Sequence, residues 1–179
     1  MPTKHKKLVM EEHIGQPPSK HEKREFPVGK EGLTFCRICS AVYYKKSWHH
    51  SLRKYDNLPE NMKVKFVVCP ADQTILDHQF EGEIIIQNIP DKIQSDLMNL
   101  IRGYTQRSYA KDPMDRLIEA KKTRDGLRVT TTENQMAVRL AKKIKDSFKK
   151  VSLEIHYAKP PLETVHIKMR FNDRSLMSS

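Results

Sequence analysis

Residues 82–104 read GEIIIQNIPDKIQSDLMNLIRGY, and this stretch joins two different periodicities. Residues 83–87 (EIIIQ) are a short apolar run that is typical of a buried strand. Pro90 and Asp91 then open a helix, in which Asp91 and Gln94 match a capping box. One apolar stripe follows at helical spacing, made of Ile93, Leu97, Leu100, Ile101 and Tyr104. The stretch therefore predicts a buried strand followed by a helix with one apolar face.

A hairpin is predicted after this helix. Pro113 breaks the helical pattern, because proline disfavours the helical conformation in the residue before it. Residues 125–126 (Asp-Gly) are a strong turn signal between two segments, residues 116–120 and 127–131. We expect these two segments to pair as antiparallel strands.

A second helix and two more strands complete the pattern. Thr132 and Gln135 match the capping signature again and predict a helix over residues 133–150. Residues 152–158 and 165–171 alternate between apolar and polar side chains, as strands do. The order strand, helix, two strands, helix, two strands predicts an α+β sandwich, in which two helices cover one face of a mostly antiparallel sheet.

Composition points to the kind of partner. The 179 residues carry a formal net charge of +11, with 37% hydrophobic and 31% charged side chains. Nucleic acid is the commonest polyanionic partner of such a basic chain, and an anionic membrane surface comes second. A basic surface that serves only solubility is the third alternative.

The chain divides into four predicted parts. Residues 1–30 are rich in Lys, His, Glu and Pro and predict a basic, disordered tail. We expect a zinc-ribbon-like module over residues 31–81, the α+β domain over residues 82–172, and a disordered C-terminus over residues 173–179. No run of about 20 apolar residues and no export signal is visible, so a cytoplasmic protein without a membrane span is expected.

Two cysteine corners, each a short turn that offers two potential metal ligands, predict a metal site. Cys36 and Cys39 form one C-x-x-C pair, and Cys69 is followed three residues later by Asp72. Zinc prefers four ligands in a tetrahedron, which two such corners can supply, with Asp72 as the favoured fourth ligand. Three histidines could take the fourth position instead, namely His49, His50 and His78. The alternative is a decayed site, whose cysteines are only small buried residues.

An aromatic and basic stretch follows the first cysteine corner. Aromatic rings stack on bases, and basic side chains neutralise phosphates. A segment that mixes the two therefore suits looped or single-stranded RNA. Trp48 is expected to be structural and to form the small core of the module. The predicted RNA contacts are Tyr44, Lys45, Lys46, His50, Arg53 and Lys54.

The helix over residues 133–150 has two unlike faces. Its apolar face is formed by Ala137, Leu140, Ala141, Ile144 and Phe148. Its basic face carries the second set of predicted RNA contacts, Arg139, Lys142, Lys143, Lys149 and Lys150. Only Asp146 interrupts the positive charge, whereas a face built for solubility normally mixes signs. A plain solvated face is the competing interpretation.

Motifs of catalysis are missing from the sequence. There is no glycine-rich phosphate loop, no nucleophile elbow, no zinc-protease motif and no kinase signature. We therefore expect a protein that is not an enzyme and has no small-molecule substrate.

The order of these pieces resembles a known family. The pieces are FCRIC at 35–39, Trp48, VCPA at 68–71, FEGEIII at 80–86, DPMDRLIE at 112–119 and TTTENQMA at 130–137. Over residues 33 to 171 they resemble the N-terminal part of the large-subunit export adaptors (the nonsense-mediated-decay-three family), and still more their small bacterial relatives. The resemblance implies a zinc module, a domain similar to ribosomal protein L22e, and binding to the large ribosomal subunit. It places metal ligands at Cys36, Cys39, Cys69 and position 72, where the family has cysteine and this chain has aspartate.

The sequence therefore predicts a monomeric, ribosome-associated rRNA-binding protein. A constitutive component of the large subunit, an assembly factor and a dormancy factor all fit this prediction. Two alternatives stay open: a zinc-ribbon regulator that binds DNA or RNA polymerase, and an adaptor that binds a partner protein through an exposed sheet face.

Overall fold

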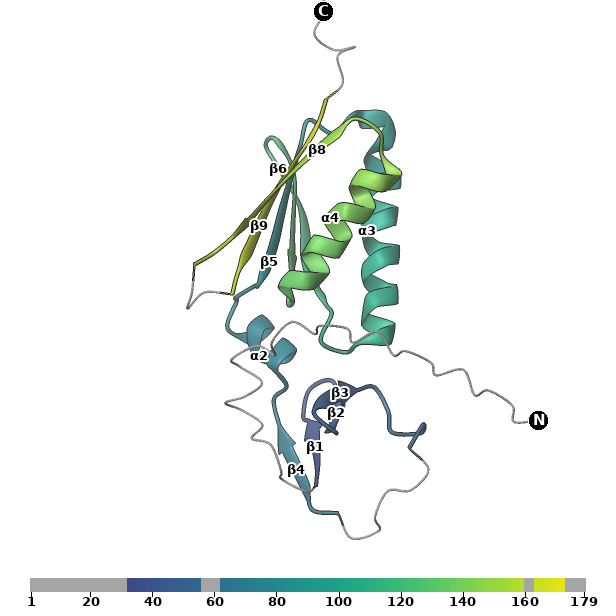
Figure 1. Cartoon of the computed structure of the whole chain (residues 1–179), viewed down its shortest axis with the longest axis vertical. Helices are drawn as coiled ribbons and strands as arrows, with labels where there is room; N and C mark the ends of the chain where they lie inside the picture. The colour runs from purple at the N-terminus through teal and green to yellow at the C-terminus, as the bar shows by residue number, and fades with distance from the viewer. Residues whose placement is uncertain (1–31, 56–61, 160–162, 173–179) are drawn as a thin grey trace, which may run out of the picture. The chain divides into compact units, whose positions relative to one another are not determined.

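The chain folds as an α+β protein. The computed structural model describes residues 32–55, 62–159 and 163–172, which form two mixed sheets and three helices (Figure 1). This architecture confirms the predicted fold class. The predicted tail over residues 1–30 and the predicted C-terminus over residues 173–179 lie outside the described residues.

The first sheet belongs to the N-terminal module, the knuckle. Its strands are β1 (Leu33–Cys36), β2 (Val42–Tyr44), β3 (Ser47–His49) and β4 (Val64–Val67), in the order β3-β2-β1-β4. β4 pairs parallel with β1, and the other pairs are antiparallel. Trp48 is buried, with its ring centroid 5.4 Å from that of Tyr43. The prediction that Trp48 forms the small core of this module is consistent with this burial.

A short helix, α2 (Pro70–Leu76), follows the first sheet and was not predicted from the sequence. Cys69 is its N-cap and Pro70 its first residue, where the missing N–H of proline costs nothing. Seven residues are too few for a helical periodicity to stand out. The second cysteine corner is therefore the start of a helix.

The second sheet contains five strands. These are β5 (Gly82–Gln87), β6 (Leu117–Thr123), β7 (Gly126–Thr131), β8 (Val151–Tyr157) and β9 (Val165–Phe171), in the order β6-β7-β5-β9-β8. Only β5 and β9 pair parallel, so the sheet is mostly antiparallel, as predicted. Asp125 of the predicted Asp-Gly pair lies in the turn between β6 and β7, and Gly126 is the first residue of β7.

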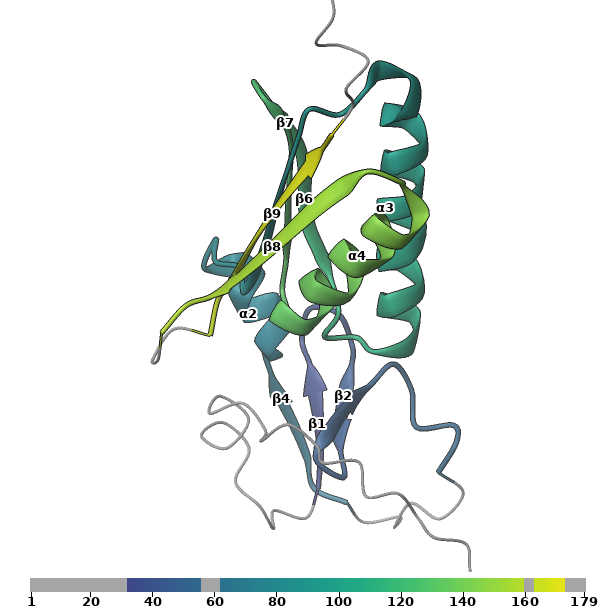
Figure 2. The same ribbon diagram turned by 45° about the horizontal axis from the view of Figure 1, so that its top comes forward.

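Both long helices cover one face of this sheet. They are α3 (Asp91–Lys111) and α4 (Asn134–Ser147), which lie side by side in Figures 1 and 2. The largest buried side chains of the core come from both layers, among them Ile84, Ile86, Leu97, Ile101, Leu140, Ile144 and Ile167. The opposite face of the sheet carries the alternate, mostly polar side chains.

The helix ends differ from the predicted capping boxes. Pro90 is the N-cap of α3, and the Gln94 amide donates to the Asp91 carboxylate at 2.9 Å, so the two side chains pair with each other instead of capping the backbone. The Thr132 hydroxyl donates to the Met114 carbonyl, and α4 begins at Asn134 without a side-chain cap. The helix also ends at Ser147, three residues before its predicted end.

A close approach at Gly82 gives a test of this packing. A Cβ atom on Gly82 would overlap the Thr131 hydroxyl and the Ala137 side chain of α4. We expect Gly82→Ala to lower the free energy of unfolding by about 1–3 kcal/mol in chemical denaturation. Gly103→Ala is the control, because its Cβ would meet only the end of the flexible Arg107 side chain, and it should be neutral or stabilising by about 0.5–1 kcal/mol. Equal effects of the two substitutions would contradict the packing at Gly82.

Candidate metal centre and basic surfaces

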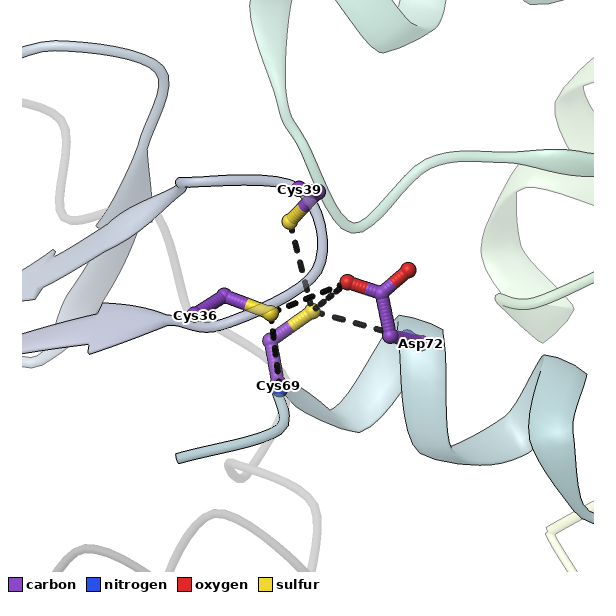
Figure 3. A group of neighbouring side chains, drawn as sticks. All are labelled: Cys36, Cys39, Cys69 and Asp72. Atoms are coloured by element: carbon purple, nitrogen blue, oxygen red, sulfur yellow. Dashed lines mark hydrogen bonds between the residues drawn. The ribbon is translucent and has the colours of Figure 1, made fainter. Parts of the chain in front are cut away.

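Four potential metal ligands converge where the two corners meet. Cys36 ends β1 and Cys39 lies in the turn that follows, whereas Cys69 caps α2 and Asp72 lies in its first turn. Their three sulfur atoms and one carboxylate oxygen all lie within 4.8 Å of one another (Figure 3). The predicted set of ligands is thus brought together and could hold a metal ion.

One carboxylate oxygen faces the thiols. Asp72 Oδ2 accepts hydrogen bonds from Cys36 Sγ at 3.0 Å and from Cys69 Sγ at 3.1 Å. The Sγ atoms of Cys39 and Cys69 are 3.7 Å apart. Three sulfur donors and one oxygen donor at two tight corners fit the tetrahedral coordination of zinc.

Backbone N–H groups also point at the sulfur atoms. The N–H groups of Ile38 and Cys69 donate to Cys36 Sγ at 3.4 and 3.3 Å, and the Asp72 N–H donates to Cys69 Sγ at 3.4 Å. Backbone N–H donors of this kind orient the sulfur ligands and favour the thiolate form that binds a metal. The local chain conformation therefore already suits metal-binding cysteines.

Burial and hydrogen bonding shift the pKa values of the thiols and of the carboxyl group in opposite directions. Burial raises the pKa of the Cys39 and Cys69 thiols above the ordinary value of 9.0. Burial would also raise the pKa of Asp72, but hydrogen bonds from the three cysteines and Arg116 outweigh it and lower that pKa to about 2. Without a metal, a negative carboxylate faces protonated thiols, and a bound cation would displace the thiol protons.

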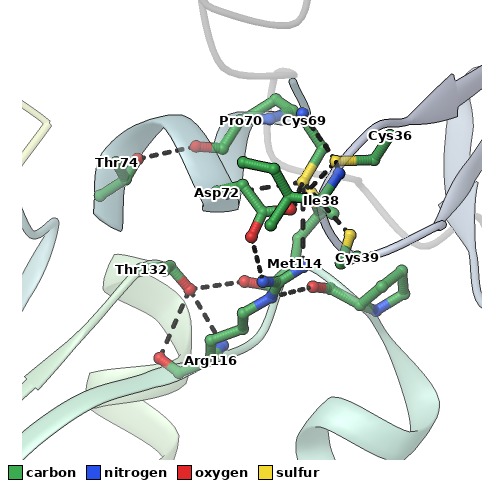
Figure 4. Close-up of polar contacts among 11 residues, drawn as sticks. Cys36, Ile38, Cys39, Cys69, Pro70, Asp72, Thr74, Met114, Arg116 and Thr132 are labelled. Carbon is green, nitrogen blue, oxygen red and sulfur yellow. Dashed lines mark hydrogen bonds and ion pairs between the residues drawn. The ribbon is translucent and has the colours of Figure 1, made fainter. Parts of the chain in front are cut away.

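Arg116 completes the site and was missed as a site residue. Its Nη1 donates to Asp72 Oδ1 at 2.6 Å, and its Nη2 lies 3.8 Å from Cys69 Sγ (Figure 4). Arg116 directly precedes β6, and 44 positions separate it from Asp72. Only the folded chain brings the two residues together.

The alternative histidine ligands lie elsewhere. His49 Nε2 is 3.1 Å from the Tyr44 carbonyl oxygen, and His50 Nε2 is 2.5 Å from that of Tyr109 in α3. His78 follows the end of α2. Within residues 32–55, 62–159 and 163–172, the one group that could hold a metal contains Asp72 and no histidine.

The predicted RNA contacts of the knuckle lie on its surface. Lys45 Nζ lies 5.5 Å from the centroid of the Tyr44 ring and 5.4 Å from that of the Tyr55 ring. These two rings meet edge to face at 5.1 Å. The other predicted contacts are all exposed, namely Lys46, His50, Arg53 and Lys54. Two tyrosine rings and one lysine therefore form a small cationic and aromatic cluster.

The predicted RNA contacts of the second helix are exposed as well. They are Arg139, Lys142 and Lys143 in α4, and Lys149 and Lys150 just after it. Arg139 differs from the others, because its Nη2 pairs with the Asp115 carboxylate at 2.6 Å. Arg139 is therefore already engaged within the protein, and the lysines supply the free positive charge of this face.

A second polar cluster lies on the open face of the five-stranded sheet. The Glu83 carboxylate accepts from Arg128 Nε at 2.6 Å and contacts His166 Nδ1 at 2.8 Å. Burial would raise the pKa of Glu83, but the hydrogen bonds and charges of these two partners lower it below the ordinary value of 4.5. Sequence reasoning missed this cluster, whose residues come from three strands.

This depressed pKa predicts a stability effect with a definite sign. The cluster stabilises the fold above pH 4.5, and this contribution is lost as the pH falls through the lowered pKa of Glu83. We expect Glu83→Gln to lower the unfolding free energy at pH 7 by about 1–2 kcal/mol, and to lower it less in acid. Glu119→Gln is the control, because that carboxylate is half-exposed and lies 3.9 Å from Arg128. Urea unfolding at several pH values measures these effects. Unfolding free energies of both variants that followed the wild type at every pH would contradict the expectation.

Comparisons with known proteins add no relative. No protein-family model matches the chain, and no curated protein matches it. Among the helices of the described residues, none is both long and apolar enough to cross a membrane. The function must therefore be argued from the site itself.

Proposed function

We propose that this chain is an rRNA-binding protein that associates with the ribosome through the large subunit. The observation that carries the proposal is the exposed face of α4. Lys142 and Lys143 are exposed there and make no ion pair with any residue that the structure describes. Lysines without acidic partners suit phosphate contacts, which dominate the affinity of proteins for nucleic acids.

The knuckle supplies a second contact surface in this proposal. Tyr44 and Tyr55 offer aromatic surface beside the Lys45 ammonium group. Such a cluster suits unpaired bases, which rRNA exposes in loops and bulges. Duplex DNA keeps its bases stacked, so the cluster favours structured RNA over a duplex DNA target.

We propose zinc as the metal of the candidate centre. Thiolates select zinc over the hard cations magnesium and calcium, and Cys36, Cys39, Cys69 and Asp72 supply a complete set of four ligands. A zinc ion bound there would cross-link the turn after β1 to the start of α2. The knuckle needs such a link, because its small sheet has few buried side chains besides Ala41, Val42 and Trp48.

One observation favours a protein-binding adaptor as the second candidate. The edge strand β4 exposes Val64 and Phe66, whose exposed fractions are 51% and 59%. Exposed apolar side chains on an edge strand suit the addition of a partner strand. Such binding would persist in high salt, whereas phosphate contacts would not.

Binding measurements separate these functions. The purified protein is titrated with large-subunit rRNA, with small-subunit rRNA and with duplex DNA, each from about 50 to 300 mM salt. We expect tightest binding to large-subunit rRNA and a steep fall in affinity with salt. Equal binding to all three ligands would reduce the proposal to non-specific charge attraction, and no binding at low salt would contradict it.

A further inference from the structure

Arg116 joins the candidate metal centre to the second sheet. The Asp72 carboxylate is buried, and its two oxygens have different partners: Oδ2 faces the sulfur atoms, and Oδ1 accepts from Arg116 at 2.6 Å. The carboxylate thus presents a single oxygen to the position where a metal would bind. An unrestrained carboxylate could rotate or offer both oxygens.

The Arg116 side chain is itself held in place by contacts outside the metal centre. Its Nε donates to the Pro113 carbonyl at 2.9 Å, and its backbone N–H donates to the Thr132 hydroxyl at 2.9 Å. Its guanidinium carbon lies 5.5 Å from the centroid of the Tyr109 ring. Figure 4 shows the Arg116 side chain with its contacts to Asp72 and Thr132. The guanidinium is therefore oriented by α3 and by the segment that follows it, independently of a metal.

Charge gives the guanidinium a second role. Three thiolates and one carboxylate carry four negative charges, of which a divalent ion offsets two. Excess negative charge in a buried site is costly unless a cation is close. Of the basic side chains in the described residues, Arg116 is the one that contacts this group. It supplies the missing positive charge at the carboxylate.

We propose that Arg116 is the positioning residue of the metal centre, fixing Asp72 as a ligand through one oxygen and offsetting the charge of the ligand set. This inference rests on the proposed zinc site. It also explains how aspartate can stand at position 72. A carboxylate has two oxygens and can bind the guanidinium and a metal together, whereas a cysteine there would leave Arg116 without its anionic partner.

Metal affinity of the full-length chain tests the assignment. The metal-free protein is titrated with zinc against a chromophoric chelator, and with Co²⁺, whose visible spectrum depends on the ligands. We expect Arg116→Met to weaken zinc binding about 10- to 100-fold and to change the Co²⁺ spectrum. Arg116→Lys should lose less, since it keeps the charge without the planar fork. Arg139→Met is the matched control, because it breaks an equally short pair, with Asp115, and should stay within about twofold of wild type.

A rescue variant separates positioning from general stability. In the double variant Asp72→Cys with Arg116→Met, the ligand at position 72 has a single donor atom and needs no orientation, whereas the charge of the ligand set stays without its offset. We therefore expect a zinc affinity at least about fivefold above that of Arg116→Met and still below that of wild type. A loss of affinity in Arg116→Met no larger than in Arg139→Met overturns the positioning role. A double variant that binds zinc as weakly as Arg116→Met also overturns the positioning role. If the wild-type protein binds neither zinc nor Co²⁺, the metal centre itself is refuted, which is a different outcome.

Discussion

Replacing Cys69 by serine is expected to abolish metal binding and to unfold the knuckle. Cys69 is fully buried, caps α2 and contacts the three other ligands, Cys36, Cys39 and Asp72. A serine hydroxyl is a poor zinc ligand, so the content should fall from about one zinc per chain to less than about 0.1. Because metal binding and folding are coupled at such sites, we also expect a loss of at least about 3 kcal/mol of knuckle stability.

Ala71→Ser is the matched control for this substitution. Ala71 is buried between the ligands Cys69 and Asp72, so the variant introduces the same hydroxyl and keeps all four ligands. Metal analysis under reducing conditions and limited proteolysis of the knuckle measure the two effects. Addition of a chelator to the wild type should reproduce the proteolysis pattern of Cys69→Ser. A Cys69→Ser protein with full metal content and an intact knuckle would contradict the proposed centre.

Reversing the charge of Lys142 and Lys143 is expected to weaken rRNA binding about 30-fold at low salt. Both side chains are exposed on the outer face of α4, so their replacement by glutamate should leave the core intact. Each lost phosphate contact should also reduce the slope of log affinity against log salt by about 0.7–0.9. Filter binding over a salt series measures affinity and slope, and far-UV circular dichroism checks the fold.

A charge-matched variant on the other face of the protein provides the control. Lys121 and Lys168 are exposed on the side of the second sheet away from the helices. Their replacement by glutamate changes the net charge equally, and we expect binding to stay within about threefold of wild type. If both double variants lose affinity alike, α4 is no specific RNA-binding surface and only net charge matters.

The regular elements could be predicted because burial imposes a periodicity on them. The predicted strand over residues 165–171 has the bounds of β9, since its apolar side chains alternate under the helices. Capping was predicted less well. The Thr132 hydroxyl has a choice of acceptors and donates to the Met114 carbonyl, 18 positions away, instead of capping α4. Such a choice depends on the tertiary structure, which local patterns do not contain.

The metal ligands could be proposed from sequence because each corner is local. A spacing of three residues places Cys36 beside Cys39 and Cys69 beside Asp72. Arg116 could not be found in this way, because 44 positions separate it from its partner Asp72. The Glu83 cluster could not be predicted for the same reason, since the partner of Glu83, Arg128, lies 45 positions further along the chain. Contacts that decide how a site is tuned are often long-range, even where its ligands are close in sequence.

The association with the ribosome is tested most directly by sedimentation of native cell lysate through sucrose gradients at low and high salt, with detection of this protein in each fraction. The proposed function predicts that the protein migrates with the large subunit or whole ribosomes at low salt. It also predicts that high salt releases the protein to the top of the gradient, because exposed lysines make the contacts. A protein that stays at the top of the gradient at low salt would contradict the ribosomal function.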